Sequence, residues 1–246
     1  MGDSVRMTPV RFLVAATRAV GWFVVASVEA VLFTHRHPED ISVTHRYAHR
    51  LSEGWIRIFH LRHTILNGER LVNSQPCVYL VNHRSNLDIV VLAEAFPTGT
   101  VVIGKRALLK VPMFGKIFTR GGNIVIDRLN PDDARAGIST GERAIMERGH
   151  SVWIFPEGTR NFGKLRSFKK GAFHMARNAR VPIVPLVCAV PRAWLEGSRL
   201  FLRRETEVKI EVLEAVDPHS FESVDDLIEH TRGRMLEALN RLESEL

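Results

Sequence analysis

A histidine and an aspartate five positions apart, His83 and Asp88, are the pair best suited to acid–base chemistry in this sequence. If the chain turns between them, a carboxylate oxygen of Asp88 can accept a hydrogen bond from one ring nitrogen of His83 and fix its tautomer. The other ring nitrogen can then act as a general base, and the nucleophile can be a hydroxyl group of the substrate. The same spacing also fits a capped helix that carries an ordinary surface histidine.

Two elements must position this pair. Residues 77–81 are apolar and predict a short buried strand, and residues 87–96 predict a helix, so His83 lies where the strand ends. Ser85 or Asn86 is a natural N-cap for that helix. Because ligands of α/β sheets usually bind at the carboxyl ends of the strands, His83 lies at the edge where a ligand is expected.

Three further blocks follow along the chain. They are GNIVIDR at 122–128, FPEGTR at 155–160 and VPIVPL at 181–186. Together with NHRSNLD at 82–88, they resemble the signature blocks of the glycerolipid acyltransferases, in particular the 1-acylglycerol-3-phosphate acyltransferases. All four blocks of that family are present in order between about residues 77 and 187, which makes the resemblance far more specific than any single motif.

The resemblance implies transfer of an acyl group from a thioester to a glycerol hydroxyl. His83, oriented by Asp88, is expected to take the proton of the hydroxyl as it attacks. The resulting oxyanion needs hydrogen-bond donors, which Lys105 or the backbone amides near Gly104 can supply, and the sequence leaves this choice open. Because a thiolate is a stable leaving group, no covalent enzyme intermediate is required, and neither a cofactor nor a metal ion is expected.

The resemblance also assigns recognition of a phosphate group to Arg128 and Arg160, because guanidinium groups match phosphate oxygens in a bidentate way. Gly158 and Thr159 can add a backbone donor and a hydroxyl donor. Glu157 is a poor phosphate ligand, and we expect it to position a glycerol hydroxyl or to order the loop arginine. Structural alternatives exist, since Arg128 can pair with an acidic neighbour and Gly158 can simply permit a turn.

The sequence departs mildly from the family pattern. Val125 stands where Phe is common, and Arg84 and Asn86 occupy variable positions around His83. None of these differences removes a catalytic group. The block at 181–186 is expected to be structural, with apolar residues that line a wall or the path of the acyl chain.

The composition of the 246-residue chain is that of a globular protein, with 45% hydrophobic and 25% charged residues. Its net charge of +7 indicates an anionic partner, either a phospholipid surface or a phosphorylated substrate. Nucleic acid is not expected, because the sequence has neither zinc-finger spacing nor an aromatic RNA-binding motif. The two cysteines, Cys77 and Cys188, lie in apolar runs and are expected to be buried thiols.

Residues 12–33 form the most apolar segment, which is long enough to span a bilayer. Arg18 and Glu29 interrupt it eleven residues apart, and therefore on one side of a helix. This pattern favours an amphipathic helix lying in the headgroup region, with a spanning helix as the alternative. A small-residue cleavage site is lacking, so a removed signal peptide is not expected.

A second helix is predicted for residues 42–63, with apolar residues at three- and four-residue steps. Its aromatic stripe, flanked by cations, fits a helix that binds anionic lipid and equally fits a helix packed on the protein core. Many family members carry an N-terminal helix pair that anchors them to the membrane, which favours lipid. His45 and His49 are interpreted as interfacial residues, and the protein is expected on the cytoplasmic face of a membrane. The stripe consists of Tyr47, Leu51, Trp55, Ile58 and Phe59.

The predicted fold is α/β, a mixed and mostly parallel sheet with helices on both faces, preceded by a membrane-associating helix pair. The expected division is 1–63 for the helix pair and 64–246 for the acyltransferase domain. Asn67 and Gly68 predict a two-residue hairpin turn near the start of that domain. Further strands are predicted at 100–103, 122–126, 151–155, 183–190 and 208–213, and further helices at 130–148 and from 223 onward.

The expected acceptor is lysophosphatidate, acylated at its sn-2 hydroxyl to give phosphatidate, with another lysolipid or glycerol 3-phosphate as alternatives. The acyl donor is expected to be acyl-CoA or acyl carrier protein, and the seven Lys or Arg residues at 160–180 can bind either. Outside the enzymes, the alternative is a membrane-binding adaptor that has lost catalysis. The intact His83, Asp88, Glu157 and Arg160 argue against an adaptor, and a hydrolase with a serine nucleophile elbow is not expected.

Overall fold

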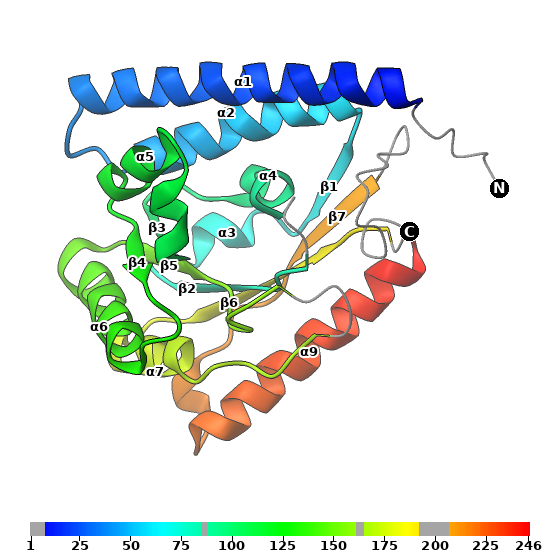
Figure 1. The fold of residues 1–246 in the computed structure, drawn as a ribbon. Helices are drawn as coiled ribbons and strands as arrows, with labels where there is room; N and C mark the ends of the chain where they lie inside the picture. Colours follow the sequence, from blue (N-terminus) through cyan, green and yellow to red (C-terminus); the bar gives the residue numbers. More distant parts are fainter. Residues whose placement is uncertain (1–7, 85–87, 161–164, 192–206) are drawn as a thin grey trace.

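The structure, a computed structural model, describes residues 8–84, 88–160, 165–191 and 207–246. Its central strands are β1 (Arg62–Leu66), β2 (Val78–Val81), β3 (Thr100–Lys105), β4 (Ile124–Ile126), β5 (Ser151–Ile154), β6 (Ile183–Ala189) and β7 (Glu207–Val212). They form one sheet in the order β1-β7-β6-β2-β5-β3-β4, with helices on both faces (Figure 1). The five strands from β6 to β4 run parallel, whereas β7 is antiparallel to β6 and parallel to β1. The predicted mixed, mostly parallel sheet is confirmed.

Signals in the sequence set the ends of several helices. The Asn130 side chain accepts hydrogen bonds from the first turn of α6, Pro131 is the first residue of that helix, and Gly149 ends it in a left-handed conformation. Ser223 caps α9 in the same way by accepting a hydrogen bond from the Asp226 amide. The α-helices are α1 (Pro9–Arg36), α2 (Ser42–Phe59), α3 (Arg70–Asn73), α4 (Asp88–Val91), α5 (Phe114–Arg120), α6 (Pro131–Arg148), α7 (Gly171–Ala179) and α9 (Val224–Ser244), and the 3₁₀ helices are η1 (Leu92–Ala95), η2 (Arg106–Lys110) and η3 (Pro218–Ser220).

Helices bury both faces of the central strand β2. Val78 and Leu80 pack into a core shared with α6, α7 and α9, while Tyr79 and Val81 pack into a core shared with α2 and η1. A strand covered on both faces is apolar along its whole length rather than at alternate positions. This explains why residues 77–81 could be recognised as a strand from the sequence.

The first two helices pack closely on each other, and α2 lies between α1 and the rest of the protein (Figure 1). Trp22 Nε1 in α1 donates a 2.8 Å hydrogen bond to the carbonyl oxygen of Arg50 in α2, and the hydroxyl oxygens of Ser27 and Tyr47 are 3.1 Å apart. Gly54 permits this approach, because a Cβ atom at that position would lie 1.9 Å from Trp22 Nε1. The contact between the helices is therefore specific and close.

The aromatic stripe of α2 faces the protein, so the interpretation of this stripe as lipid-binding is wrong and the core alternative is confirmed. His45 Nδ1 and His49 Nε2 lie 2.8 Å and 3.0 Å from the carbonyl oxygen of Phe96, so these histidines hold the end of η1 and are not interfacial. Helical periodicity marks an apolar face but does not say whether protein or lipid covers it. The buried members of the stripe are Tyr47, Leu51 and Phe59.

Two predicted elements near the start of the sheet are also wrong. The second helix ends at Phe59, because His60 adopts a left-handed conformation with a φ of 52°, and the chain then enters β1. Asn67 has a φ of 57°, as in a tight turn, but α3 follows it rather than a strand. The partner of β1 is β7, in parallel pairing, so no hairpin forms at Asn67-Gly68.

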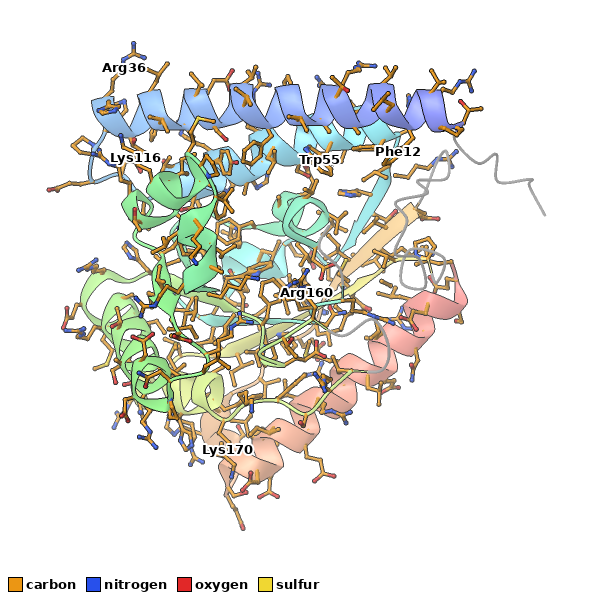
Figure 2. All side chains as sticks on the ribbon, in the orientation of Figure 1. Phe12, Arg36, Trp55, Lys116, Arg160 and Lys170 are labelled. Atoms are coloured by element: carbon orange, nitrogen blue, oxygen red, sulfur yellow. The ribbon has the colours of Figure 1, made fainter. Side chains whose placement is uncertain are left out.

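The outer side of α1 is apolar and exposed. Figure 2 shows its side chains pointing away from the rest of the protein along the whole helix. Among the described helices, α1 alone is long and apolar enough to cross a membrane. An exposed apolar surface of this length indicates membrane association. Its exposed apolar residues are Val10, Leu13, Val14, Val20, Val24, Val25, Val28 and Leu32.

Candidate active site

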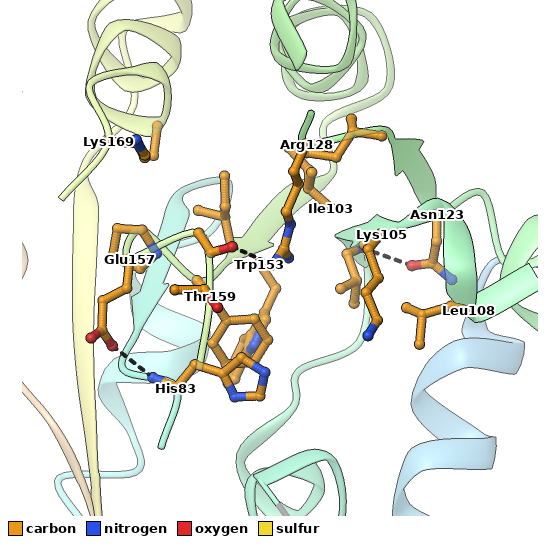
Figure 3. Close-up of a pocket in the computed structure, with 18 of the residues that line it drawn as sticks. His83, Ile103, Lys105, Leu108, Asn123, Arg128, Trp153, Glu157, Thr159 and Lys169 are labelled. Atoms are coloured by element: carbon orange, nitrogen blue, oxygen red, sulfur yellow. Dashed lines mark hydrogen bonds between the residues drawn. The ribbon is translucent and has the colours of Figure 1, made fainter. Parts of the chain in front are cut away.

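Four parallel strands end at one edge of the sheet, and a cavity of about 1410 Å³ opens there. His83 follows β2, Lys105 is the last residue of β3, Arg128 follows β4, and residues 157–160 follow β5. Figure 3 shows His83, Lys105 and Arg128 approaching this space from their separate strand ends. The cavity is lined by all of the predicted site residues, which are His83, Asp88, Lys105, Arg128, Glu157, Gly158, Thr159 and Arg160.

His83 and Asp88 make the contact that their spacing predicts. Nδ1 of His83 lies 2.7 Å from Oδ2 of Asp88, and the backbone N–H of Arg84 donates to the same oxygen at 2.6 Å. The imidazole ring also stacks on Phe155, with ring centroids 4.3 Å apart. Since Nδ1 is held by Asp88, Nε2 is the nitrogen that can accept a proton from a substrate.

The helix that supplies Asp88 is shorter than expected. Only Asp88–Val91 is α-helical, and the chain continues as the 3₁₀ helix η1, so the single helix predicted at 87–96 is wrong in its length and type. Asp88 nevertheless lies in the first helical turn, as the sequence indicated. The predicted N-caps, Ser85 and Asn86, lie outside the described residues.

Two buried side chains fix the loop that carries His83. The Asn82 amide donates to the carbonyl of Cys188 at 3.0 Å and accepts from its N–H at 2.8 Å, which joins the end of β2 to β6. Glu157 is only 4% exposed, and its two oxygens accept hydrogen bonds from the backbone N–H groups of His83 and Arg166, each at 3.0 Å. Glu157 therefore orders the backbone on both sides of the cavity.

The buried position of Glu157 changes its acidity. Desolvation raises the pKa of this carboxyl group above its ordinary value, although the two backbone hydrogen bonds and the charges of His83 and Arg84 oppose the change. The ionised carboxylate is the form that can accept both N–H groups at once. Protonation of Glu157 is therefore expected to loosen the His83 loop.

The two predicted phosphate-binding arginines border the same part of the cavity. Arg128 donates from Nη1 to the carbonyl oxygen of Gly158, whose φ of +70° suits a glycine. Part of the Arg128 side chain is open to solvent, yet desolvation by the cavity wall, and then the positive charge of Arg160, lower its pKa. Two guanidinium groups that repel each other form a favourable place for a dianion.

Most other lining residues were not predicted from the sequence. His174 adds a basic group, Lys169 belongs to the basic stretch at 160–180 that was expected to bind the acyl donor, and an apolar arm of the cavity runs between α2 and α5. Its walls include Tyr47, Leu51, Phe114, Ile117 and Phe118. The two faces of these helices meet only in the folded chain, so sequence spacing could not reveal the arm. The block at 181–186 instead lies in the core strand β6 and at its entry, and none of its residues lines the described cavity, so the expected acyl path there is wrong.

A Gly-x-Ser-x-Gly pattern is present at residues 137–141, but it does not form a nucleophile elbow. It lies inside α6, whereas a nucleophile elbow requires a sharp turn between a strand and a helix. Its two glycines instead allow close packing, because a Cβ atom at Gly137 would lie 2.2 Å from Ile126 Cγ2 and one at Gly141 would lie 2.6 Å from Met175 Cε. The pattern is therefore a packing feature of the helix.

The two cysteines and the possible metal ligands of the described residues are further candidates for a role in the site. Cys77 and Cys188 are buried free thiols, as predicted, and desolvation raises the pKa of Cys77 to about 12, so it stays protonated at neutral pH. Within the described ranges, no group of three or more His, Cys, Asp or Glu side chains is arranged to hold a metal ion.

The chain was compared with known proteins. A family model described as Acyltransferase matches residues 62–189. The 1-acyl-sn-glycerol-3-phosphate acyltransferase of Haemophilus influenzae is 32% identical over 218 residues, which cover 86% of this chain and 86% of that protein. The human 1-acyl-sn-glycerol-3-phosphate acyltransferase beta is 39% identical over 167 residues, which cover 67% of this chain and 59% of that protein.

A solved structure shares the fold. The crystal structure of the 1-acyl-sn-glycerophosphate acyltransferase PlsC from Thermotoga maritima superposes with a TM-score of 0.73 at 19% sequence identity, over 95% of this chain and 98% of that one. The match includes the sheet and the preceding helices. The family match over residues 62–189 and the relatives at 32% identity over 86% of the chain show that this protein belongs to the acyltransferase family and is an enzyme of the O-acyltransferase class.

Proposed function

We propose that this enzyme transfers a fatty acyl group from an acyl thioester to the sn-2 hydroxyl of 1-acylglycerol 3-phosphate, giving phosphatidate. The observation that carries the proposal is that a His–Asp pair and two arginines line one cavity at the ends of four parallel strands. A general base and a dianion site on the same cavity match an acceptor that has both a hydroxyl and a phosphate. The names of the relatives support the same acceptor.

The chemistry follows from the position of His83. Its Nε2 takes the proton of the acceptor hydroxyl while the hydroxyl oxygen attacks the thioester carbon, and Asp88 stabilises the imidazolium that forms. The tetrahedral intermediate then collapses, the carbon–sulfur bond breaks, and the proton returns to the departing thiolate. Lys105, at the end of β3 on the same cavity, is suited to stabilise the oxyanion of this intermediate.

The arginine side of the cavity is suited to the phosphate. Arg128 and Arg160 supply two guanidinium groups, and Thr159 adds a hydroxyl donor next to them. Gly158 keeps its carbonyl turned to Arg128, which orients that guanidinium. Glu157 acts on this site through the backbone, because its carboxylate holds the loops of His83 and Arg166.

The apolar arm between α2 and α5 is suited to an acyl chain, and it also relates the site to the membrane. Tyr47 and Leu51 of α2 line the cavity, and α2 packs directly beneath α1. If the apolar side of α1 attaches the enzyme to the membrane, the cavity lies close to the lipid acceptors in that membrane. We place the enzyme on the cytoplasmic face, where acyl-CoA and acyl carrier protein are available as donors.

An acceptor panel tests the proposal. Purified enzyme is given lysophosphatidate, glycerol 3-phosphate or a non-phosphorylated lysolipid, each with radiolabelled acyl-CoA or radiolabelled acyl carrier protein, and His83→Ala serves as the control. We expect labelled phosphatidate from lysophosphatidate with the wild type. Labelling of another acceptor alone would overturn the proposed substrate, and no transfer with any pair would point to a membrane-binding adaptor.

A further inference from the structure

Arg84 connects the catalytic loop to the end of the chain. It directly follows His83 and is 6% exposed, and its guanidinium forms an ion pair with Glu243 near the end of α9. Figure 1 shows α9 running along the outside of the sheet from α7 to the C-terminus. A buried guanidinium is costly unless a carboxylate balances its charge, so this pair is expected to hold both elements in place.

The backbone of Arg84 is part of the His–Asp arrangement. Its N–H and His83 Nδ1 both approach Oδ2 of Asp88, at 2.6 Å and 2.7 Å. A shift of Arg84 therefore moves a donor that orients the Asp88 carboxylate. The side chain and the backbone of Arg84 together link Glu243 to the orientation of the imidazole.

Several negatively charged groups surround the Arg84 guanidinium. Burial lowers its pKa, while the charges of Asp88 and Glu157 act in the opposite direction, so both carboxylates lie within electrostatic reach of the guanidinium. Cys188 also lies close, but burial raises the pKa of its thiol well above the ordinary value, so it stays neutral. Glu243, whose side chain is partly exposed, adds an ion pair to the buried Arg84 guanidinium from the surface side.

A second contact from α9 reaches the segment at residues 165–166, which Glu157 joins to the His83 loop. Arg232 donates from Nε and Nη2 to the carbonyl oxygens of Arg166 and Leu165, at 2.9 Å and 2.6 Å. The Arg166 N–H in turn donates to Glu157. Arg232 and Glu243 are eleven residues apart, about three helical turns, and therefore lie on the same side of α9.

We propose that Arg84 and Glu243 are positioning residues, through which the C-terminal helix fixes the geometry and the electrostatic environment of the His83–Asp88 pair. This inference rests on the proposed function, in which neutral His83 is the general base. Asp88 contacts the imidazole ring itself, and Glu157 accepts the backbone N–H of His83. Lys105, Arg128 and Arg160 are the cations that line the same cavity as His83, and Glu243 acts on the pair through Arg84.

The sign of each charge change gives a sharp test. Glu243→Gln leaves the Arg84 cation less balanced, which disfavours a protonated His83, so the acidic limb of the kcat/KM profile should move to lower pH. Arg84→Met leaves Asp88 and Glu157 without their cation, which favours a protonated His83, so that limb should move to higher pH. We expect shifts of about one pH unit in opposite directions and a fall in kcat of about tenfold in each variant. Arg84→Lys, which keeps the charge, should leave the limb near its wild-type position.

Glu245→Gln is the matched control, because Glu245 ends the same helix and pairs with Lys209 at 2.9 Å, away from the cavity. It should match the wild type in kcat and in pH profile. Since Glu243 is at the surface, Glu243→Gln decides the test even if Arg84→Met does not fold. Suppose that His83→Ala is inactive, but the acidic limbs of Glu243→Gln and Arg84→Met stay at the wild-type pH or move in the same direction. This result would overturn the present inference and leave the proposed function intact. Full activity of His83→Ala would overturn it together with the proposed base.

Discussion

Glu157 holds two backbone segments with one carboxylate, and this makes the site sensitive to acid. Because desolvation raises its pKa above the ordinary value, protonation begins at a higher pH than for an exposed glutamate. The protonated group can no longer accept both N–H groups, so we expect activity to fall as pH decreases through this raised value. Glu157→Gln places an amide N–H₂ against a backbone donor and should lower the free energy of unfolding by about 1–3 kcal/mol.

Urea denaturation and kcat measured from pH 4.5 to pH 8 check the prediction for Glu157→Gln. Glu147→Gln is the control, because Glu147 is exposed on α6 and away from the cavity. A Glu157→Gln enzyme with wild-type stability and wild-type kcat would contradict a role in holding the loops.

Arg160 is predicted to act in binding rather than in the chemical step. A lysine keeps the positive charge but loses the bidentate fork, so Arg160→Lys should raise the KM for lysophosphatidate about tenfold while kcat changes little. The KM for the acyl donor should stay constant. Steady-state kinetics with both substrates check this, and Arg143→Lys, at an exposed position of α6, is the control. An unchanged KM for lysophosphatidate would argue against phosphate binding by Arg160.

At the scale of the elements, the strands position the candidate catalytic and binding residues. Residues from four separate blocks of the sequence meet because β2, β3, β4 and β5 are parallel, so that their carboxyl ends lie at one edge. The helices then give the cavity its apolar arm and its link to the membrane side. This division explains why the polar blocks stand out in the sequence and the apolar walls do not.

The helix α1 carries the prediction about membranes. Leu13 and Val20 are exposed and lie two turns apart on its outer side. The double variant Leu13→Asp and Val20→Asp should lower binding to anionic phospholipid vesicles about a hundredfold, because the apolar burial of both residues is lost. Vesicle co-sedimentation measures this. Val72→Asp, at an exposed apolar position of α3, should bind vesicles like the wild type, and equal binding by the double variant would exclude α1 as the contact surface.

At the scale of the whole molecule, partly buried histidines couple stability to pH. Desolvation is the main cause that lowers the pKa values of His45, His63 and His150 below the ordinary value of 6.5. In the unfolded chain these groups take up protons at higher pH than in the folded protein, so the free energy of unfolding decreases as pH falls through 6.5 and below. The melting temperature should therefore drop by several degrees, on the order of 5 °C, between pH 7.5 and pH 5.5.

His63 offers the clearest variant for this effect, because neither of its buried ring nitrogens has a hydrogen-bond partner among the described residues. His63→Phe should make the melting temperature less dependent on pH, while His230→Gln, at an exposed position, should keep the wild-type dependence. Thermal unfolding followed by circular dichroism checks both. Identical curves for His63→Phe and the wild type would contradict the contribution of His63.

Features of the fold that depend on neighbouring residues could be predicted from the sequence. Asn130, Pro131 and Gly149 bounded α6 correctly, and the apolar run at 77–81 identified the strand before His83, because caps and burial are visible in the residues themselves. The pairing of β1 with β7 could not be predicted from the Asn67-Gly68 turn, since it depends on a distant strand.

The same limit applies to the site. The spacing of His83 and Asp88 predicted their contact, whereas the link from Arg84 to Glu243 joins residues that are far apart in the sequence and required the structure. The sequence also could not show that the aromatic stripe of α2 faces the protein, because this depends on how α1 and α2 pack in the folded chain. Sequence motifs thus identified groups that line the cavity, and the fold identified the groups that hold them in place.

The central claim is that the His83–Asp88 pair acts as the base for acyl transfer to lysophosphatidate. The most direct measurement is the rate of phosphatidate formation by the wild type, His83→Ala and Asp88→Asn, with Asp132→Asn, exposed in the first turn of α6, as the control. We predict that kcat falls about 10²- to 10⁴-fold in the two site variants, while both keep the native fold by circular dichroism, and that the control matches the wild type. Phosphatidate formation at the wild-type rate by folded His83→Ala or Asp88→Asn would contradict the claim.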